Sequence, residues 1–151
     1  MQKITPCLWF DDRIEEAANF YVSVFKGGKI TDLNRMPDGK VITVHIEILG
    51  QTFMLLNGGP EFRFTEAVSF SVDCKDQAEV DYYWNVLTAD GGEESMCAWL
   101  KDKYGLSWQI VPEALPRLLS GSDKAGANRA MQAMLQMRKI VVADLERAYA
   151  G

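Results

Sequence analysis

The sequence predicts an α+β fold that consists of two βαβββ modules followed by a helical C-terminal tail. Three observations predict it: an internal repeat, a pair of alternating β-runs late in the chain, and helical spacing of apolar residues beyond residue 112. We expect a single domain over residues 1–151, with module one in residues 1–60, module two in residues 61–112 and the tail in residues 113–151.

The first module begins with a strand and a helix. Residues 4–10 are apolar and β-prone, and Asp11 and Asp12 are candidates for the N-cap of the helix that follows. Across residues 13–25, apolar side chains recur at intervals of three and four, which is the spacing of one buried helix face. A pair of glycines then ends the helix.

Three strands complete the first module, and we expect them over residues 29–36, 41–49 and 52–57. In the second of these, the even positions 42–48 are all apolar, whereas the odd positions include Thr43, His45 and Glu47. Because side chains alternate along a strand, the even positions belong to the core and the odd positions face water or a cavity.

The second module repeats the plan of the first. Shifting the chain from Asp11 to Asp73 aligns Phe20-Tyr21 with Tyr82-Tyr83 and Val24 with Val86. We expect Val68, Phe70 and Val72 on the core face of its first strand, with Ala67, Ser69 and Ser71 on the opposite face, followed by a helix over residues 76–88. The two modules would each bury one sheet face under a helix and curl their free faces around a shared cleft.

A hairpin over residues 97–112 closes the second module. If Gly105 supplies the positive φ of a three-residue loop, Asp102 lies opposite Leu106 and Trp99 opposite Gln109. One face then carries polar and aromatic groups, as a pocket wall does: Cys97, Trp99, Lys101, Ser107, Gln109 and Val111. The other face is apolar, as under a helix: Ala98, Leu100, Leu106, Trp108 and Ile110.

The tail is predicted to be helical. Ser122 and Asp123 can cap a helix that carries Met131, Met134 and Leu135 and, if it extends further, Arg138, and residues 141–149 form a second amphipathic segment. An apolar helix added to a complete repeat is expected to cover a sheet edge or to pack on a second subunit.

Composition narrows the class of protein. With 48% hydrophobic and 25% charged residues, 151 residues are enough for one domain with a substantial core. The net charge of −5 is the wrong sign for a nucleic-acid-binding protein, and no apolar run approaches the ~20 residues of a membrane span. The N-terminal residues show no signal sequence, so we expect a soluble cytoplasmic protein. Three cysteines without CxxC spacing favour reduced thiols.

Four segments carry a resemblance to a known family: residues 20–25, 55–60, 81–84 and 97–112. They resemble the PhnB-like (3-demethylubiquinone-9 3-methyltransferase-like) branch of the glyoxalase/bleomycin resistance/dioxygenase superfamily, also called the vicinal oxygen chelate superfamily. The resemblance implies paired βαβββ modules, a homodimer and a cupped sheet that holds a small ligand. Methyl transfer is not expected, because nothing here resembles the Gly-rich strand-to-helix turn of a Rossmann-type methyl-donor site.

The resemblance also locates where metal-dependent members of the superfamily carry their ligands. In this chain those positions fall on Pro6, on or near Ala67, on Gln109, and on the strand around Leu55. A divalent ion needs about three good protein ligands, which this set does not supply. We therefore expect no metal and no cofactor, with a substitute site on His45 and Glu47 as the alternative.

Candidate site residues come from the two polar strand faces. His45 and Glu47 can act as a general acid/base pair, although a lone strand histidine is more often packed or exposed. Cys97 is a nucleophile if Lys101 lowers its pKa, and an inert thiol otherwise. The residues expected to bind a ligand are Trp99, Gln109, Cys97, Ser69 and Thr43.

The sequence favours a metal-independent protein that binds a small molecule. The alternative is a lyase or isomerase acting on a small oxygenated substrate through His45 and Glu47. A third reading, a structural dimer without a ligand, would leave the polar and aromatic pocket face unexplained.

Overall fold

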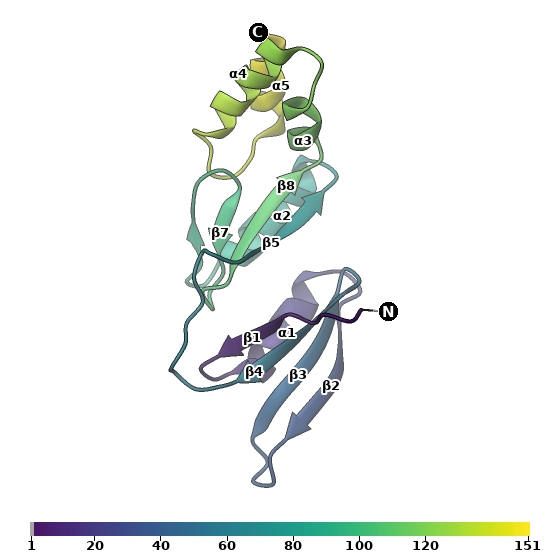
Figure 1. Ribbon diagram of the computed structural model, residues 1–151, viewed down its shortest axis with the longest axis vertical. Coiled ribbons are helices and arrows are strands. Elements are labelled where there is room, and N and C mark those ends of the chain that lie inside the picture. The colour runs from purple at the N-terminus through teal and green to yellow at the C-terminus, as the bar shows by residue number, and fades with distance from the viewer. Residues whose placement is uncertain (1) are drawn as a thin grey trace. The chain divides into compact units, whose positions relative to one another are not determined.

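The computed structural model describes residues 2–151, and the chain divides into two compact units (Figure 1). The first unit ends at Phe64, and the second runs from Thr65 to Gly151. Each unit contains one βαβββ module, and the second adds three helices, so the predicted α+β fold of paired modules with C-terminal helices is confirmed. Among residues 2–151, no helix combines the length and apolar character needed to cross a membrane.

The first unit is a four-stranded mixed sheet with one helix. Its elements are β1 (Cys7–Phe10), α1 (Ile14–Val24), β2 (Lys29–Arg35), β3 (Val41–Ile48) and β4 (Gln51–Asn57). The strand order is β1-β4-β3-β2; β1 is parallel to β4, and the other neighbours are antiparallel. Helix α1 carries the chain from β1 across the sheet to β2, and the two antiparallel pairings that follow bring β4 parallel to β1.

Helix α1 buries one face of this sheet. Ile14, Ala17 and Tyr21 are almost completely buried on the helix, as are Val44 and Leu55 on the sheet. The alternation of β3 is as predicted from residue 44 onward, because Val44, Ile46 and Ile48 are buried whereas Thr43, His45 and Glu47 are half-buried on the other face.

The start of α1 differs from the prediction. Neither Asp11 nor Asp12 is the N-cap; Arg13 takes that position with a left-handed φ of 67°, and no side chain caps the helix. The Asp12 carboxylate instead accepts a hydrogen bond of 2.7 Å from the amide of Arg13, its immediate neighbour. The preceding strand is also shorter than predicted: it begins at Cys7, and Ile4 is 85% exposed.

The second unit repeats the topology and extends it. Its elements are β5 (Ser69–Cys74), α2 (Gln77–Thr88), β6 (Glu93–Glu94), β7 (Trp99–Lys101), β8 (Ser107–Pro112), α3 (Ala114–Leu119), α4 (Lys124–Met134) and α5 (Val142–Ala150). The strand order is β5-β8-β7-β6, with β5 parallel to β8. The strands of the chain thus form two separate four-stranded sheets.

The predicted hairpin is confirmed in register. Trp99 lies opposite Gln109, the amide of Asp102 donates to the carbonyl of Leu106 at 2.9 Å, and Gly105 has a φ of 86°. The predicted core face is fully buried: Ala98, Leu100, Leu106, Trp108 and Ile110.

Two predictions at the strand ends are wrong. Val68 is 64% exposed, because β5 begins one residue later, where Ser69 pairs with the first residue of β8. Cys97 does not belong to β7, because it and Ala98 have left-handed φ values of 58° and 77°. Their amides donate to the carbonyls of Met137 and Arg138, which belong to the segment between α4 and α5.

The tail packs on the second unit. Asp123 caps α4 as predicted, accepting a hydrogen bond of 3.1 Å from the amide of Gly126. One buried cluster joins the tail to the loop before β7: Ala98, Leu115, Leu118, Ala130, Ile140 and Leu145. The helix does not extend to Arg138: α4 ends at Met134, and Arg138 lies in the segment between α4 and α5.

Candidate functional site

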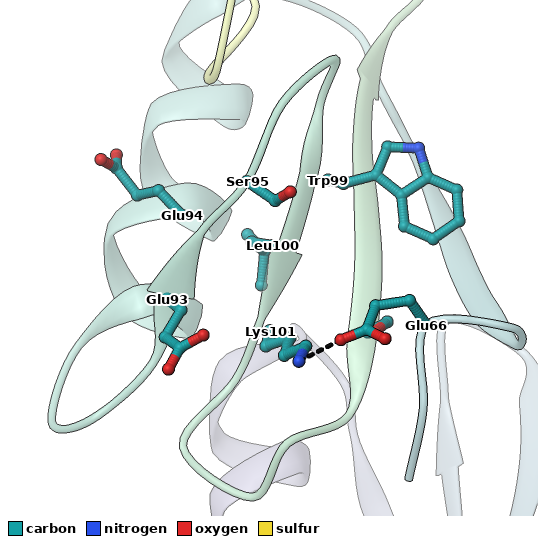
Figure 2. Close-up of a pocket in the computed structure, with 8 residues that line it drawn as sticks. Glu66, Glu93, Glu94, Ser95, Trp99, Leu100 and Lys101 are labelled. Carbon is teal, nitrogen blue, oxygen red and sulfur yellow. Dashed lines mark ion pairs between the residues drawn. The ribbon is translucent and has the colours of Figure 1, made fainter.

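A pocket of about 450 Å³ lies on the second unit, on and beside the sheet face that does not carry α2 (Figure 2). Its lining residues are Glu66, Glu93, Glu94, Ser95, Trp99, Leu100, Lys101 and Ser107. Strand pairing explains why several of these come together, because Ser107, Lys101 and Glu93 are successive partners across β8, β7 and β6. Directly paired residues project from the same face of a sheet, so they share the pocket side.

Lys101 forms an ion pair with Glu66, which lies in the segment before β5 (Figure 2). The hydrogen bond to the Glu66 carboxylate raises the pKa of Lys101, and the same bond lowers the pKa of Glu66. Glu93, the partner of Lys101 across β6 and β7, raises the pKa of Lys101 further. Lys101 and Glu66 are therefore both charged at neutral pH.

The carboxylate of Glu94 is engaged elsewhere. Its Oε1 accepts a hydrogen bond of 2.5 Å from the indole Nε1 of Trp84 on α2, and in Figure 2 the side chain points away from Lys101. This contact fixes β6 against the buried face of α2, so Glu94 shapes the wall of the pocket while Glu93 extends from the next position along the strand.

Ser107, the first residue of β8, also lines the pocket. The residue is 1% exposed, and its Oγ makes no hydrogen bond within the described structure. A buried hydroxyl without a partner is costly, and such groups in proteins normally find a protein, water or ligand partner. The Ser107 hydroxyl therefore lacks a hydrogen-bond partner that a bound ligand would supply.

The structure brings together some of the predicted ligand-binding residues. Gln109 donates from Nε2 to the Oγ of Ser69 at 3.0 Å, and Trp99 lies opposite Gln109 on the same face. Of the five, only Trp99 lines the pocket; Cys97 is removed from the strand face by its left-handed backbone. Thr43 belongs to the other unit, where its Oγ1 accepts a hydrogen bond of 3.1 Å from Asn34.

Three lining residues were not predicted as site residues from the sequence: Glu66, Glu93 and Ser107. Ser107 was on the predicted pocket face, and its pairing with Lys101 in the predicted hairpin was the signal that could have identified it. Glu66 lies outside any strand, so no periodicity places it beside Lys101.

The polar face of the first unit holds the predicted acid/base residues. His45 Nδ1 lies 3.9 Å from Asp32 Oδ2 and makes no hydrogen bond, whereas Glu47 Oε1 lies 3.5 Å from Lys29 Nζ. His45 and Glu47 therefore contact different residues of β2, Asp32 and Lys29, although both lie on one face of β3.

The residues at the superfamily's metal positions do not fit a divalent ion. Pro6 uses its carbonyl to accept from the amide of Met54, Ala67 has no donor side chain, and Leu55 is fully buried. Gln109 is bonded to Ser69. Within residues 2–151, no group of three His, Cys, Asp or Glu side chains is placed to hold a metal ion.

Comparisons with known proteins agree with this architecture. Residues 2–111 match the family described as 3-demethylubiquinone-9 3-methyltransferase, and curated proteins give no match. The PhnB protein of Bacillus cereus is 34% identical, with a TM-score of 0.68 over 74% of this chain and 99% of that chain. Two further structures show the shared fold alone. One is a Pseudomonas aeruginosa protein (19% identity, TM-score 0.62, 75% and 98% covered), and the other is the fosfomycin resistance protein FosX of Listeria monocytogenes (14%, 0.59, 80% and 98%).

The family match covers most of the chain, and the Bacillus cereus protein matches it over nearly its own full length. The two βαβββ modules and the FosX likeness show the shared fold. The chain therefore belongs to the PhnB-like family, described as 3-demethylubiquinone-9 3-methyltransferase.

Proposed function

We propose that this protein binds a small molecule without a metal ion, in the pocket of the second unit. The observation that carries the proposal is a pocket of about 450 Å³ that combines Trp99 with the buried, unpartnered hydroxyl of Ser107. Binding sites for small molecules are typically concave spaces of about 300–1,000 Å³ with apolar walls and a few directed polar groups. Trp99 would supply the apolar wall, and Ser107 and Lys101 the polar groups.

Metal independence is supported by the residues at the superfamily's ligand positions. We expect purified protein, expressed without a chelating tag, to contain close to no divalent metal per chain after incubation with nickel, zinc, manganese and iron. Elemental analysis measures this directly. Stoichiometric metal that is lost in His45→Ala or Glu47→Ala would overturn metal independence, because it would reveal a substitute site on β3.

Ligand binding is tested by a thermal-shift screen of small molecules against the wild-type protein and two variants. Trp99→Ala removes the aromatic wall, so compounds that stabilise the wild type are expected to lose their effect in this variant. Tyr82→Ala is the matched control, because Tyr82 is a 46% exposed aromatic on α2 and does not line the pocket. Shifts that are equal in all three proteins would contradict binding in this pocket.

A second candidate function is a lyase or isomerase that uses His45 on the first unit. It is favoured by one observation: Nδ1 of His45 has no hydrogen bond and lies near the Asp32 carboxylate, which could orient the ring for proton transfer. If an activity is found, His45→Ala should reduce its rate by about two orders of magnitude or more, whereas a binding protein should keep its ligand affinity within a few-fold.

Methyl transfer is not part of the proposal, although the family description names it. The turns that lead from β1 into α1 and from β5 into α2 contain Asp11–Arg13 and Lys75–Asp76, with no glycine. A Rossmann-type donor site places a Gly-rich turn at that point, where backbone amides approach the cofactor. The function proposed here therefore rests on the pocket.

A further inference from the structure

The side chains that line the pocket carry more negative than positive charge. Glu66 and Glu93 contribute two carboxylates on the pocket side, the Glu94 carboxylate is engaged with Trp84, and Lys101 contributes the one cationic side chain among the eight described lining residues, so the formal charge on the pocket side is −1. Lys101 is already bound to Glu66. A concave site of one sign concentrates ligands of the opposite sign, which here means cations.

Trp99 adds an attraction for the same class of ligand. It shares a sheet face with Lys101 and lines the same pocket, and in the view of Figure 2 its indole is drawn on the side of Glu66. Indole is the strongest aromatic partner for a cation placed over its face, within about 6 Å of the ring centroid. An aromatic wall next to carboxylates is a recurrent means of recognising organic cations.

Ser107 provides an observation independent of the carboxylates. Its hydroxyl is buried among the lining residues and has no partner. A hydroxyl oxygen accepts hydrogen bonds, and an ammonium group that carries hydrogens supplies donors without acceptors of its own. The orphan oxygen therefore fits an amine that retains an N–H.

We propose that the pocket binds a small primary or secondary amine in its protonated form, with the ammonium held by Glu93, Glu66 and the Ser107 hydroxyl and the carbon skeleton against Trp99. This inference rests on the proposed function, since it names the class of ligand for the same pocket. Lys101 limits the affinity, because it occupies the Glu66 carboxylate that the ligand would otherwise use.

Three probes of similar size and different charge test the inference by titration calorimetry at low ionic strength. They are phenethylamine, which is cationic at pH 7, 2-phenylethanol, which is neutral, and 3-phenylpropanoate, which is anionic. We expect phenethylamine to bind tightest. Glu93→Gln and Glu66→Gln should each weaken it by about two- to fivefold, as expected for partly exposed ion pairs. Glu61→Gln, an exposed glutamate of the first unit, is the matched control and should leave binding unchanged.

Lys101→Met is the most discriminating variant. For a cationic ligand, removing Lys101 frees the Glu66 carboxylate and should tighten phenethylamine binding; for an anionic ligand it should abolish binding. Lys101→Arg keeps the charge and should behave as the wild type. Ser107→Ala should weaken phenethylamine more than its N,N,N-trimethylated analogue, which has no N–H to donate.

The outcomes separate this inference from the proposed function. Tighter binding of 3-phenylpropanoate, or equal binding of 2-phenylethanol, with loss of binding in Trp99→Ala, would overturn the amine class and leave a small-molecule pocket. Binding of any probe that is unchanged in Trp99→Ala would overturn both, whereas no binding of any of the three probes would overturn the amine class and leave the proposed function to the thermal-shift screen. Unfolding midpoints measured for each variant ensure that only folded proteins are compared.

Discussion

Asp102 is the side chain that holds the hairpin of the second unit together. The residue is 2% exposed, and its carboxylate accepts from the amides of Tyr104 and Leu106 and from the indole Nε1 of Trp108, at 2.9, 3.1 and 2.9 Å. One oxygen receives the two loop amides, and the other receives the indole. An ionised carboxylate suits this position because both of its oxygens only accept.

Asp102→Asn should therefore destabilise the protein. An amide has one accepting oxygen, so its NH₂ group must face either the loop amides or the Trp108 indole, leaving buried donors unpaired. We expect a loss of about 1–3 kcal/mol in the free energy of unfolding, measured by urea denaturation. Asp73→Asn is the control: Asp73 is exposed on β5, and its substitution should change stability by less than about 0.5 kcal/mol. Equal stability of the two variants would contradict this role of Asp102.

The three free cysteines should differ in reactivity. Burial raises the pKa of Cys74 to about 12, helped by Glu79, Asp73 and Asp76, and the residue is 1% exposed. Cys7 is exposed, and burial raises its pKa less strongly. Alkylation at pH 8 followed by peptide mass spectrometry should modify Cys7 in the folded protein and Cys74 only after unfolding.

The same pKa predicts a pH dependence. The folded protein keeps the Cys74 proton up to pH about 12, whereas the unfolded thiol loses it from pH 9.0. Because the folded state binds the proton more tightly, this group's contribution is complete below pH 9 and is lost as the pH rises above it, at about 1 kcal/mol per pH unit. Unfolding free energies of the wild type and Cys74→Ala at pH 8 and 10.5 should differ accordingly; parallel losses would show that Cys74 does not titrate as described.

At the scale of elements, the segment between α4 and α5 connects the tail to α2 and to the loop before β7. Gln77, the first residue of α2, donates to the carbonyl of Ile140 at 2.9 Å and accepts from the amide of Val142 at 2.7 Å. Lys139 Nζ lies 2.8 Å from Asp81 Oδ1. The same segment receives the backbone amides of Cys97 and Ala98, which precede Trp99.

Gln77→Ala should loosen this segment without unfolding the sheet. Both amide contacts are lost, so hydrogen exchange should accelerate in residues 135–142 and at the amides of Cys97 and Ala98, while the amides of β8 keep their protection. Gln132→Ala, at an exposed position of α4, is the control. Acceleration throughout the second unit would mean that the contact supports global stability and not only the segment.

At the scale of the whole molecule, the family implies a homodimer. Light scattering coupled to gel filtration should give a mass near twice the 17.0 kDa of one chain. A mass of one chain across a range of protein concentrations would contradict the dimer.

The sequence alone predicted the elements whose physical basis is local. Alternation of apolar residues in β3 and in the hairpin fixes which face is buried, and Gly105 selects the loop that sets the register of Trp99 opposite Gln109. Helices α1 and α2 follow from their spacing of apolar residues, and both modules follow from the repeat.

Tertiary structure added the contacts that join distant parts of the chain. Glu66 reaches Lys101 from a segment without periodicity, and the buried hydroxyl of Ser107 is left without a partner. The left-handed residues Cys97 and Ala98 donate their amides to the carbonyls of Met137 and Arg138, in the distant segment between α4 and α5. Such contacts depend on how folded elements meet, and neither periodicity nor local propensity encodes where they do.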